Sequence, residues 1–296
     1  MANTTPLSAP PSAEANNPKN PSAEQLILDL RDPNLREDAL ISLSKKRERF
    51  EDLALLLWNS SCTITVLLQE IISIYRYLYP PILSASDSNR VCNALALFQC
   101  VASDPRTKTS FLNASILLYF YPFLLTTSKA RPFEYLRLTT LGVIGALVKL
   151  DDSEVVRFLL QTQVVPLCLH SMEIGSELSK TVSTFIVQKL LLDDLGLQYI
   201  CTTAQRFVAV CQILSSMVTP LAEQPSTRLL KHIIRCYLRL SEHPRASIIL
   251  NNYLPDMLKD GTIDERLRDD PGTRKCLHLL LHNVSAAVRA NQQGRI

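Results

Sequence analysis

The chain has 296 residues, of which 47% are apolar, and a formal net charge of only +3. This apolar content supports a large core, whereas the mild charge argues against a protein dedicated to nucleic-acid binding, although clustered cations could still form a basic patch. Seven glycines against seventeen prolines, with few strand-like alternations, argue against a nucleotide-binding α/β sheet. The composition therefore predicts an all-α protein whose helices are punctuated by proline.

The eight cysteines form no C-x-x-C motif and mostly have apolar neighbours. This pattern indicates reduced core residues in an intracellular protein rather than a disulfide framework. The amino terminus lacks a charged and then apolar signal segment, and the longest apolar run, 116–125, is about half a membrane span and contains Pro122. We therefore expect a soluble protein that is not secreted and has no membrane partner.

Two helices are predicted at the start of the folded region, at 22–30 and 33–47. Ser22 with Gln25 matches a capping box, and Asp32 before a proline matches an N-cap with proline at the first helical position. Before them, the proline- and asparagine-rich amino terminus cannot offset the entropy of ordering and is predicted to be disordered.

The next stretch, 49–79, carries helical periodicity that is broken around 59–61 and stopped by Pro80-Pro81. The only tryptophan, Trp58, ends the first of these helices. We expect its ring to be a packing anchor between helices rather than part of a ligand site.

Four strongly apolar helices then recur, beginning at Asn89, Glu134, Glu177 and Thr227. Each is followed by a short polar break and two shorter helices, and the starts are spaced by 45, 43 and 50 residues. This period is typical of armadillo or HEAT repeats, whose units stack into a solenoid with a continuous core. The prediction is a single elongated armadillo-type solenoid.

The predicted domain organisation has three parts. Residues 1–20 form the disordered tail, 21–285 the armadillo-repeat domain, and 286–296 a frayed carboxyl-terminal tail that follows a capping helix at about 271–285.

The breaks between helices carry helix-start signals. Asp104-Pro105-Arg106 is nearly repeated as His243-Pro244-Arg245, and the other breaks contain Asp151-Asp152 and Asp193-Asp194. A third aspartate pair, Asp269-Asp270, also stands at a loop-to-helix junction. We interpret these carboxylates as helix caps rather than as metal ligands or acid–base catalysts.

The long helices of such a solenoid are expected to line a concave groove with polar residues. Besides the last helix, the candidate residues are Asn89, Arg90, Asn93, Arg137, Thr140, Lys180, Ser183 and Thr184.

The fourth long helix, 227–240, is the most clearly amphipathic. One face carries a row of cations, which we call the basic stripe: Arg228, Lys231, Arg235 and Arg239. Two interpretations stay open, a solvated helix face or a binding surface for an acidic peptide or a single-stranded nucleic acid.

Residues for catalysis are not found at diagnostic spacing. The sequence shows no nucleophile beside a base, no phosphate loop and no metal cluster. Gly142 and Gly145 fit close helix packing, and His278 and His282 with Cys276 nearby lack a separated second ligand pair. We predict no catalytic residues, no metal and no cofactor.

Several long strings resemble one known family. They are SNRVCNALAL at 88–97, RPFEYLRLTTLGVIGALVK at 131–149, GSELSKTV at 175–182 and RLLKHIIRCYLRL at 228–240. They closely resemble the "required for cell differentiation" family, the armadillo-repeat subunit of the Ccr4-Not deadenylase complex, and look most like plant members. The likeness runs from about Ser22 to Val284.

The resemblance implies a non-catalytic adaptor of the cytoplasm and nucleus that links recruiting proteins to messenger-RNA deadenylation. It implies docking on the Not scaffold subunit through the segment after the tryptophan, which maps onto Asn59, Ser61, Thr65 and Ile72. Pockets for tryptophan-containing recruiting proteins map onto Pro166, Arg206 and Arg245. Family members also form homodimers and are associated with nucleic acid through a basic cleft. The alternative function is therefore a nucleic-acid-binding module, linked to decay or to transcription.

The sequence departs from the family at three places. Ser61-Cys62 replaces a typical Phe-Gly, so an apolar contact to the scaffold is missing and weaker docking is expected. Ala204 stands where animal members carry tyrosine, and Cys276 replaces a usual tryptophan.

Overall fold

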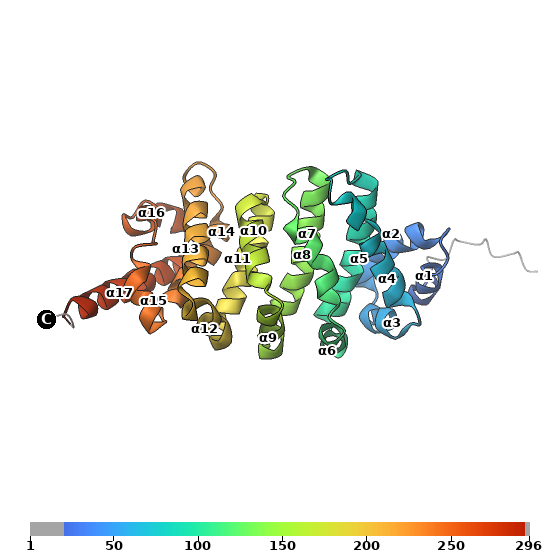
Figure 1. The fold of residues 1–296 in the computed structure, drawn as a ribbon, viewed down its shortest axis with the longest axis horizontal. Coiled ribbons are helices and arrows are strands. Elements are labelled where there is room, and N and C mark those ends of the chain that lie inside the picture. The colour runs from blue at the N-terminus through green and yellow to red at the C-terminus, as the bar shows by residue number, and fades with distance from the viewer. Residues whose placement is uncertain (1–20, 294–296) are drawn as a thin grey trace, which may run out of the picture.

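The computed structural model describes residues 21–293, and the tail predicted for 1–20 lies outside the described residues. Within them the chain forms α-helices and short 3-10 helices and no strand. The helices stack side by side into one elongated solenoid with the described chain ends at opposite ends (Figure 1). The predicted all-α solenoid is confirmed.

The amino-terminal unit is built from short helices. They are α1 (Ala23–Asp29), α2 (Arg36–Lys46), η1 (Arg47–Arg49), α3 (Leu53–Asn59), α4 (Thr63–Ser73) and η2 (Tyr75–Tyr77).

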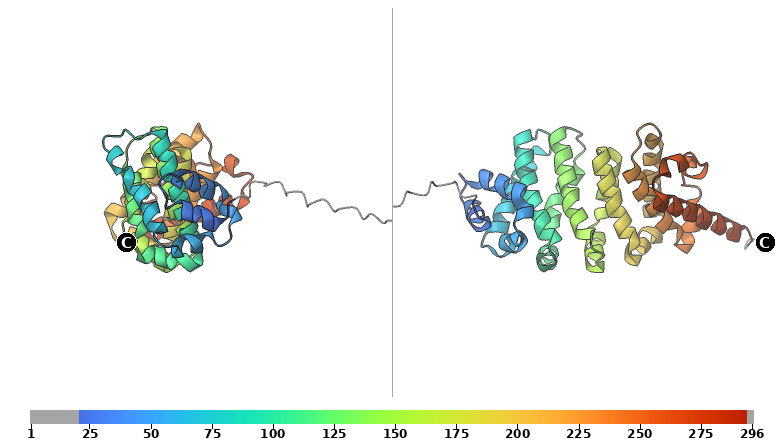
Figure 2. Two further views of the ribbon diagram at one scale, coloured as in Figure 1. Left: turned by 90° about the vertical axis from the view of Figure 1, so that its right-hand side faces the viewer. Right: turned by 180° about the vertical axis from the view of Figure 1, so that it is seen from behind.

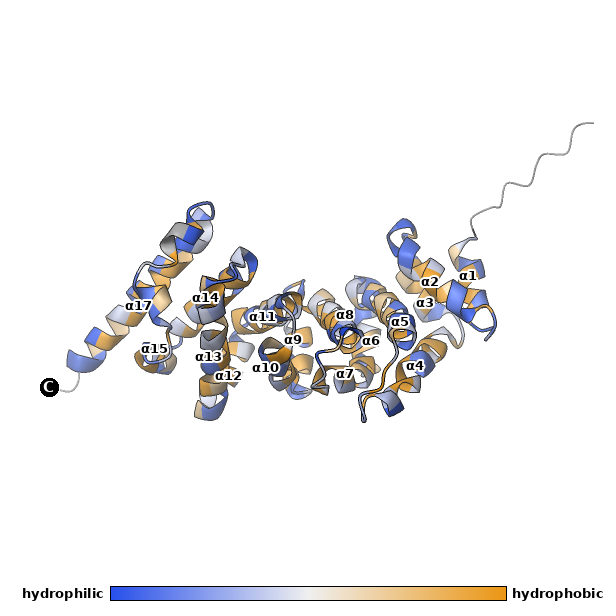
Figure 3. Cartoon of the chain, turned by 90° about the horizontal axis from the view of Figure 1, so that it is seen from above, coloured by the Kyte–Doolittle hydropathy of each residue, from blue (hydrophilic) through white to orange (hydrophobic). Residues whose placement is uncertain are grey.

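Four long helices follow at the predicted repeat, and a fifth closes the stack. They are α5 (Ala85–Ser103), α8 (Arg131–Val148), α11 (Glu177–Leu192), α14 (Thr227–Ser241) and α17 (Pro271–Gln293). Each packs most extensively against the next one, and Figure 3 shows them in order along the inner side of a curved row. A concave face is therefore formed mainly by these helices.

Shorter helices complete each repeat on the edge and the outer side (Figures 1 and 2). The edge helices are α6 (Pro105–Asn113), α9 (Ser153–Gln161), α12 (Asp194–Thr202) and α15 (Pro244–Leu250). The outer elements are η3 (Ile116–Phe120), α7 (Tyr121–Leu125), α10 (Val164–Ile174), α13 (Ala204–Val218), η4 (Thr219–Ala222), α16 (Asp256–Lys259) and η5 (Asp264–Leu267).

The capping interpretation of the polar breaks is confirmed. Asp104, Asp152 and Asp193 each accept a hydrogen bond from the backbone N–H two residues later, at 2.8, 3.0 and 2.8 Å. The Nδ1 atom of His243 accepts from the N–H of Ala246 at 3.4 Å. These side chains pair donors that a helix start leaves open, which fixes where each edge helix begins.

Two predicted helix boundaries are wrong. The Oδ1 atom of Asp32 accepts from the N–H of Asn34 at 2.9 Å within a turn, and α2 begins only at Arg36. At the other end, α17 does not end near Ser285 but runs to Gln293, because the alanine-rich segment after it has high helix propensity.

One continuous core runs through the stack. Trp58 is half-buried and packs against this core, which confirms its role as a packing anchor. All eight cysteines are free thiols, and the core contains Cys92, Cys168, Cys211 and Cys236.

Candidate functional site

The concave face contains three adjoining cavities of about 880, 510 and 600 Å³. The first and second share Tyr135 and Leu138, and the second and third share Leu178 and Val182. They therefore form one continuous channel from α5 across α8 and α11 to α14, which we call the concave groove.

The floor of the concave groove is apolar at its centre and cationic at its ends. Tyr135 of α8 and Leu178 of α11 are about half exposed there. Lys45 and Arg47 line the α2 end, while Arg228 and other residues of α14 line the opposite end. Such a channel suits an extended or helical segment with an apolar face and negative charges.

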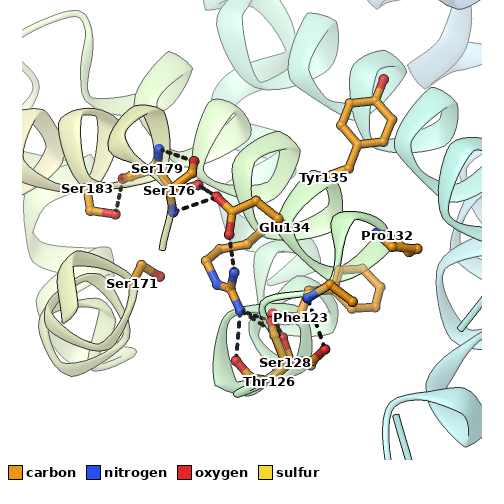
Figure 4. Close-up of polar contacts among 12 residues, drawn as sticks. Phe123, Thr126, Ser128, Pro132, Glu134, Tyr135, Ser171, Ser176, Ser179 and Ser183 are labelled. Atoms are coloured by element: carbon orange, nitrogen blue, oxygen red, sulfur yellow. Dashed lines mark hydrogen bonds and ion pairs between the residues drawn. The ribbon is translucent and has the colours of Figure 1, made fainter. Parts of the chain in front are cut away.

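The wall between α8 and α11 is held by a polar network (Figure 4). Glu134 accepts from the Ser176 N–H at 3.0 Å and the Ser179 hydroxyl at 2.6 Å, and it pairs with the guanidinium of Arg137. Burial alone would raise the pKa of Glu134, but these hydrogen bonds and the Arg137 charge hold that pKa below its usual range.

The other end of this network is the loop between α7 and α8. Arg137 donates to the carbonyl oxygens of Thr126 and Ser128, at 2.9 and 3.1 Å, and its side chain is 0% exposed. Its guanidinium therefore fixes the loop and α8 to one another, and through Glu134 it fixes α11 as well.

Half of the predicted groove residues are wrongly placed. Arg137, Thr140, Ser183 and Thr184 are fully buried. The Ser183 and Thr184 hydroxyls donate to carbonyl oxygens one turn back in α11. The inner helices are packed on several sides, so a polar residue on them can face a neighbouring helix instead of the groove.

Asn89 and Asn93 line the concave groove as predicted, and Asn93 accepts from the hydroxyl of Ser44 at 2.9 Å. Arg90 instead donates to Glu70, at 2.5 and 2.9 Å, and pairs with the carboxylate of Glu37 at 3.2 Å. Its charge is neutralised within the protein. Lys180, the remaining candidate, is partly exposed on α11.

The basic stripe lies on α14, and two of its four cations are already paired. The Lys231 amine is 3.3 Å from the Asp270 carboxylate. Arg239 pairs with Asp194 and Glu242 and donates to the carbonyl oxygen of Leu191 at 3.0 Å. Arg228 and Arg235 have no ion-pair partner among residues 21–293. The charge available to a ligand is therefore concentrated on these two residues.

His232 is the groove residue whose role the sequence did not reveal. Its Nδ1 atom is 2.6 Å from Oε1 of Gln188, and its ring meets Phe185 edge to face at 5.6 Å. Burial, and then the charges of Arg235, Arg228 and Lys231, lower its pKa to about 4. The ring is neutral at pH 7, so Nδ1–H donates to Gln188.

The four predicted docking residues all lie on one exposed segment. Asn59 ends α3, Ser61 is in the α3–α4 turn, and Thr65 and Ile72 share a face of α4 about two turns apart. The structure therefore places them along one side of the α3–α4 unit.

A patch of exposed apolar residues continues from this segment. The hydroxyl of Tyr75 donates to the carbonyl oxygen of Tyr119, and that of Tyr79 donates to the carbonyl oxygen of Leu125 at 3.0 Å. These bonds fix η2 and the turn after it against η3 and α7. We call the exposed residues Ile72, Tyr79, Ile82, Tyr119 and Leu125 the apolar patch. Tyr79 and Ile82 are 63% and 64% exposed, more than a fold alone requires.

Cys62 stands at the start of α4 with φ of 63°. This left-handed conformation favours glycine, because a Cβ atom crowds the following carbonyl oxygen. The residue that the family typically has here is therefore the one that the backbone favours.

The predicted tryptophan-pocket residues lie on three outer or edge helices. Pro166 is near the start of α10, Arg206 near the start of α13 and Arg245 in α15, and all are exposed. The Arg206 guanidinium is already 4.0 Å from the centre of the Tyr199 ring and donates to the Tyr199 carbonyl oxygen at 3.1 Å. A ligand indole would have to share or displace this stacking.

Within the described chain, no group of three histidine, cysteine, aspartate or glutamate residues is placed to hold a metal ion. Between Pro21 and Gln293 no single helix has the length and apolar character to cross a membrane, and the one pair that does so jointly, 53–59 with 63–77, is bent by 90°.

Solved structures of armadillo repeat proteins resemble this fold. A designed armadillo repeat protein in complex with a (KR)4 peptide matches with a TM-score of 0.60 at 14% identity, covering 89% of this chain and all of that one. A second designed armadillo repeat protein matches with a TM-score of 0.61 at 14% identity, covering 91% and 99%. At this identity the likeness concerns the fold alone.

Two yeast proteins are similar in sequence over most of the chain. The cell differentiation protein rcd1 of Schizosaccharomyces pombe is 59% identical over 266 residues, 90% of this chain and 94% of that protein. Protein CAF40 of Saccharomyces cerevisiae is 55% identical over 282 residues, 91% and 76% of the respective chains. The model of the cell differentiation family, Rcd1-like, matches residues 26–284. The chain therefore belongs to the Rcd1-like cell differentiation family.

Proposed function

We propose that this protein is a non-catalytic adaptor subunit of a Ccr4-Not-type deadenylase complex, acting in cytoplasm and nucleus. The family membership supports the role, and the observation that carries it is the apolar patch beside the predicted docking residues. In this proposal the α3–α4 unit docks on the Not scaffold subunit, and other surfaces of the solenoid bind recruiting proteins.

The geometry of the apolar patch supports a protein partner. Its two tyrosine-anchored contacts hold the large side chains in place before binding, so little ordering entropy remains to be lost. Burying Ile72 and Tyr79 together would remove their exposed apolar surface from water, which is the main favourable contribution in association.

The test is co-purification of the tagged full-length chain with the Not scaffold subunit and the deadenylase. Ile72→Asp and Tyr79→Ala are expected to lower scaffold recovery at least tenfold, and Leu279→Asp, on an equally accessible leucine of α17, is the control. Ser61→Phe should increase recovery, because it restores an apolar contact. The proposal fails if folded wild-type protein recovers neither partner.

A second candidate function is binding of single-stranded nucleic acid or an acidic peptide in the concave groove. Its specific support is the pair of unneutralised cations, Arg228 and Arg235, at the end of that groove. Titration of a labelled single strand at two salt concentrations tests it, since each neutralised phosphate adds about −0.7 to the slope of log K against log salt.

Charge reversal distinguishes the groove from general electrostatics. Arg228→Glu with Arg235→Glu should abolish binding, whereas Arg157→Glu on the exposed side of α9 should have little effect. Equal losses in both variants would assign the binding to net charge alone.

Recruitment through tryptophan-containing proteins remains a further part of the adaptor proposal. Pro166, Arg206 and Arg245 would each give a shallow slot for an indole, of about 1–2 kcal/mol, so several tryptophans on one ligand would need to act together. Peptides with one, two and three tryptophans should bind with steeply increasing affinity. Sedimentation over a concentration series tests the homodimer that the resemblance implies.

A further inference from the structure

The four edge helices begin in the same way, which gives the repeats a common register along the lower edge in Figure 1. Their N-cap residues are Asp104, Asp152, Asp193 and His243. Residues at equal distances from these caps occupy equivalent positions, so the repeats can be compared with one another.

This comparison finds exposed leucines in one repeat only. Two residues after the cap, the other repeats have Arg106, Glu154 and Arg245, but α12 has Leu195, which is 44% exposed. One residue before the cap, the other repeats have Ser103, Asp151 and Glu242, but α11 ends with Leu192, which is 47% exposed. Since three repeats fold with polar residues there, the fold does not require these leucines.

A third leucine lies beside them. Leu150, two residues before the cap of α9, is 51% exposed, whereas its equivalents Ala102, Leu191 and Ser241 are buried. Leu150 and Leu192 line opposite sides of a cavity of about 360 Å³ between the carboxyl ends of α8 and α11. We call this cavity the edge notch.

The edge notch is acidic, in contrast to the net positive chain. Its lining contains Asp151, Asp152 and Asp193 but one amine, Lys189. That amine is 2.6 Å from Asp151, yet the Asp151 side chain remains 82% exposed. Asp194, next to the lining, is 93% exposed. These carboxylates therefore have oxygen atoms accessible to an additional donor.

We propose that the edge notch binds a short basic peptide segment of a partner protein. A leucine-sized side chain of that segment lies between Leu150 and Leu192, and a neighbouring lysine or arginine pairs with Asp151 or Asp194. The leucines supply apolar contact, the carboxylates select a cationic flank, and the same carboxylates repel phosphate, so a nucleic acid is not the ligand. This site is separate from the apolar patch and from the concave groove, and it does not depend on the adaptor proposal.

The probe is a set of three acetylated and amidated hexapeptides, added to the full chain with labelled leucine methyl groups. Their sequences are Lys-Arg-Leu-Leu-Lys-Arg, Glu-Asp-Leu-Leu-Asp-Glu and Lys-Arg-Ser-Ser-Lys-Arg. We expect only the first to shift the methyl resonances of Leu150, Leu192 and Leu195 in a saturable way. Absence of such shifts, or shifts confined to Leu178 of the concave groove, would overturn the proposal.

Variants are taken from the sister repeats, where the fold already tolerates the residue. Leu192→Ser and Leu195→Glu should each weaken peptide binding at least fivefold, and Asp151→Asn with Asp194→Asn should remove the preference for the basic peptide. Leu279→Ser, at a leucine 48% exposed on α17, is the matched control and should bind as wild type. If instead the notch leucines mediate a dimer that Leu192→Ser disperses in sedimentation, a second copy is the occupant and the peptide proposal is wrong.

Discussion

At the scale of single residues, the backbone at Cys62 gives the clearest prediction. The left-handed conformation costs a residue with a Cβ atom about 1–2 kcal/mol, while glycine loses about 0.5–1 kcal/mol more entropy on folding. Because the Cys62 side chain is exposed, its removal costs little packing. Cys62→Gly should therefore raise the free energy of unfolding by about 0.5–1 kcal/mol, measured by urea denaturation.

Cys62→Ala is the matched control, since it removes the thiol but keeps the Cβ atom. It should leave the urea midpoint near that of the wild type. Equal midpoints for the glycine and alanine variants would show that the left-handed backbone is not the cause.

A second residue-scale prediction concerns His232 and acid. Its pKa falls from about 6.5 in the unfolded chain to about 4 in the fold, so the unfolded state binds more protons between these values. Stability from this group is therefore complete above pH 6.5 and is lost as the pH falls toward 4. The full shift corresponds to about 3 kcal/mol, which solvent screening of the partly exposed ring reduces to about 1–2 kcal/mol.

The measurement is urea denaturation at pH 7 and pH 4 for the wild type and for His232→Gln, which keeps a donor toward Gln188. The variant should lose about 1–2 kcal/mol less than the wild type over this interval. Identical losses in both proteins would mean that His232 does not titrate in this window.

At the scale of elements, the Glu134–Arg137 network should stabilise the junction of α8 and α11. Glu134→Gln leaves the fully buried Arg137 without its carboxylate, and removing one partner of a buried pair costs about 3–5 kcal/mol. We expect a loss of about 2–4 kcal/mol in urea denaturation, because Glu134 is partly exposed. Adding Arg137→Met should recover part of it.

The exposed pair Asp256–Lys259 in α16 provides the comparison. Asp256→Asn should change stability by less than about 1 kcal/mol, as is usual for surface ion pairs. A loss at Asp256 equal to that at Glu134 would remove the distinction between the buried network and an ordinary surface pair.

The element scale also separates what the sequence predicts from what it does not. Helix periodicity, repeat length and the caps at Asp152 and Asp193 depend on neighbouring residues, and these predictions are confirmed. Which side of an inner helix faces the groove depends on packing from several directions, so Arg137 was wrongly assigned.

Long-range pairing is the second reason why the candidate site was only partly predicted. Lys231 meets Asp270 across 39 residues, and Arg239 meets Asp194 across 45. Amphipathicity shows that these cations share a helix face, but it cannot show that a distant carboxylate neutralises them. The exposed apolar patch was missed for a related reason, because Tyr79 and Tyr119 belong to segments that only the tertiary fold joins.

At the scale of the whole molecule, the solenoid separates its binding surfaces. The apolar patch lies in the amino-terminal unit and the basic stripe on α14 near the other end (Figure 1). Each long helix packs mainly on its neighbours, so stability and perturbation are expected to be transmitted locally. The two surfaces should therefore act independently if both bind ligands.

This independence predicts additive effects in a double-mutant cycle. Ile72→Asp should weaken binding of the scaffold subunit at least tenfold in the wild-type background and equally in the Arg235→Glu background. The interaction energy between the two substitutions should stay within about 0.5 kcal/mol, the usual limit for distant sites. Calorimetric titration of both single variants and of the double variant measures it. A larger interaction energy would mean that the solenoid bends as one body on binding, since local packing alone provides no contact between α4 and α14.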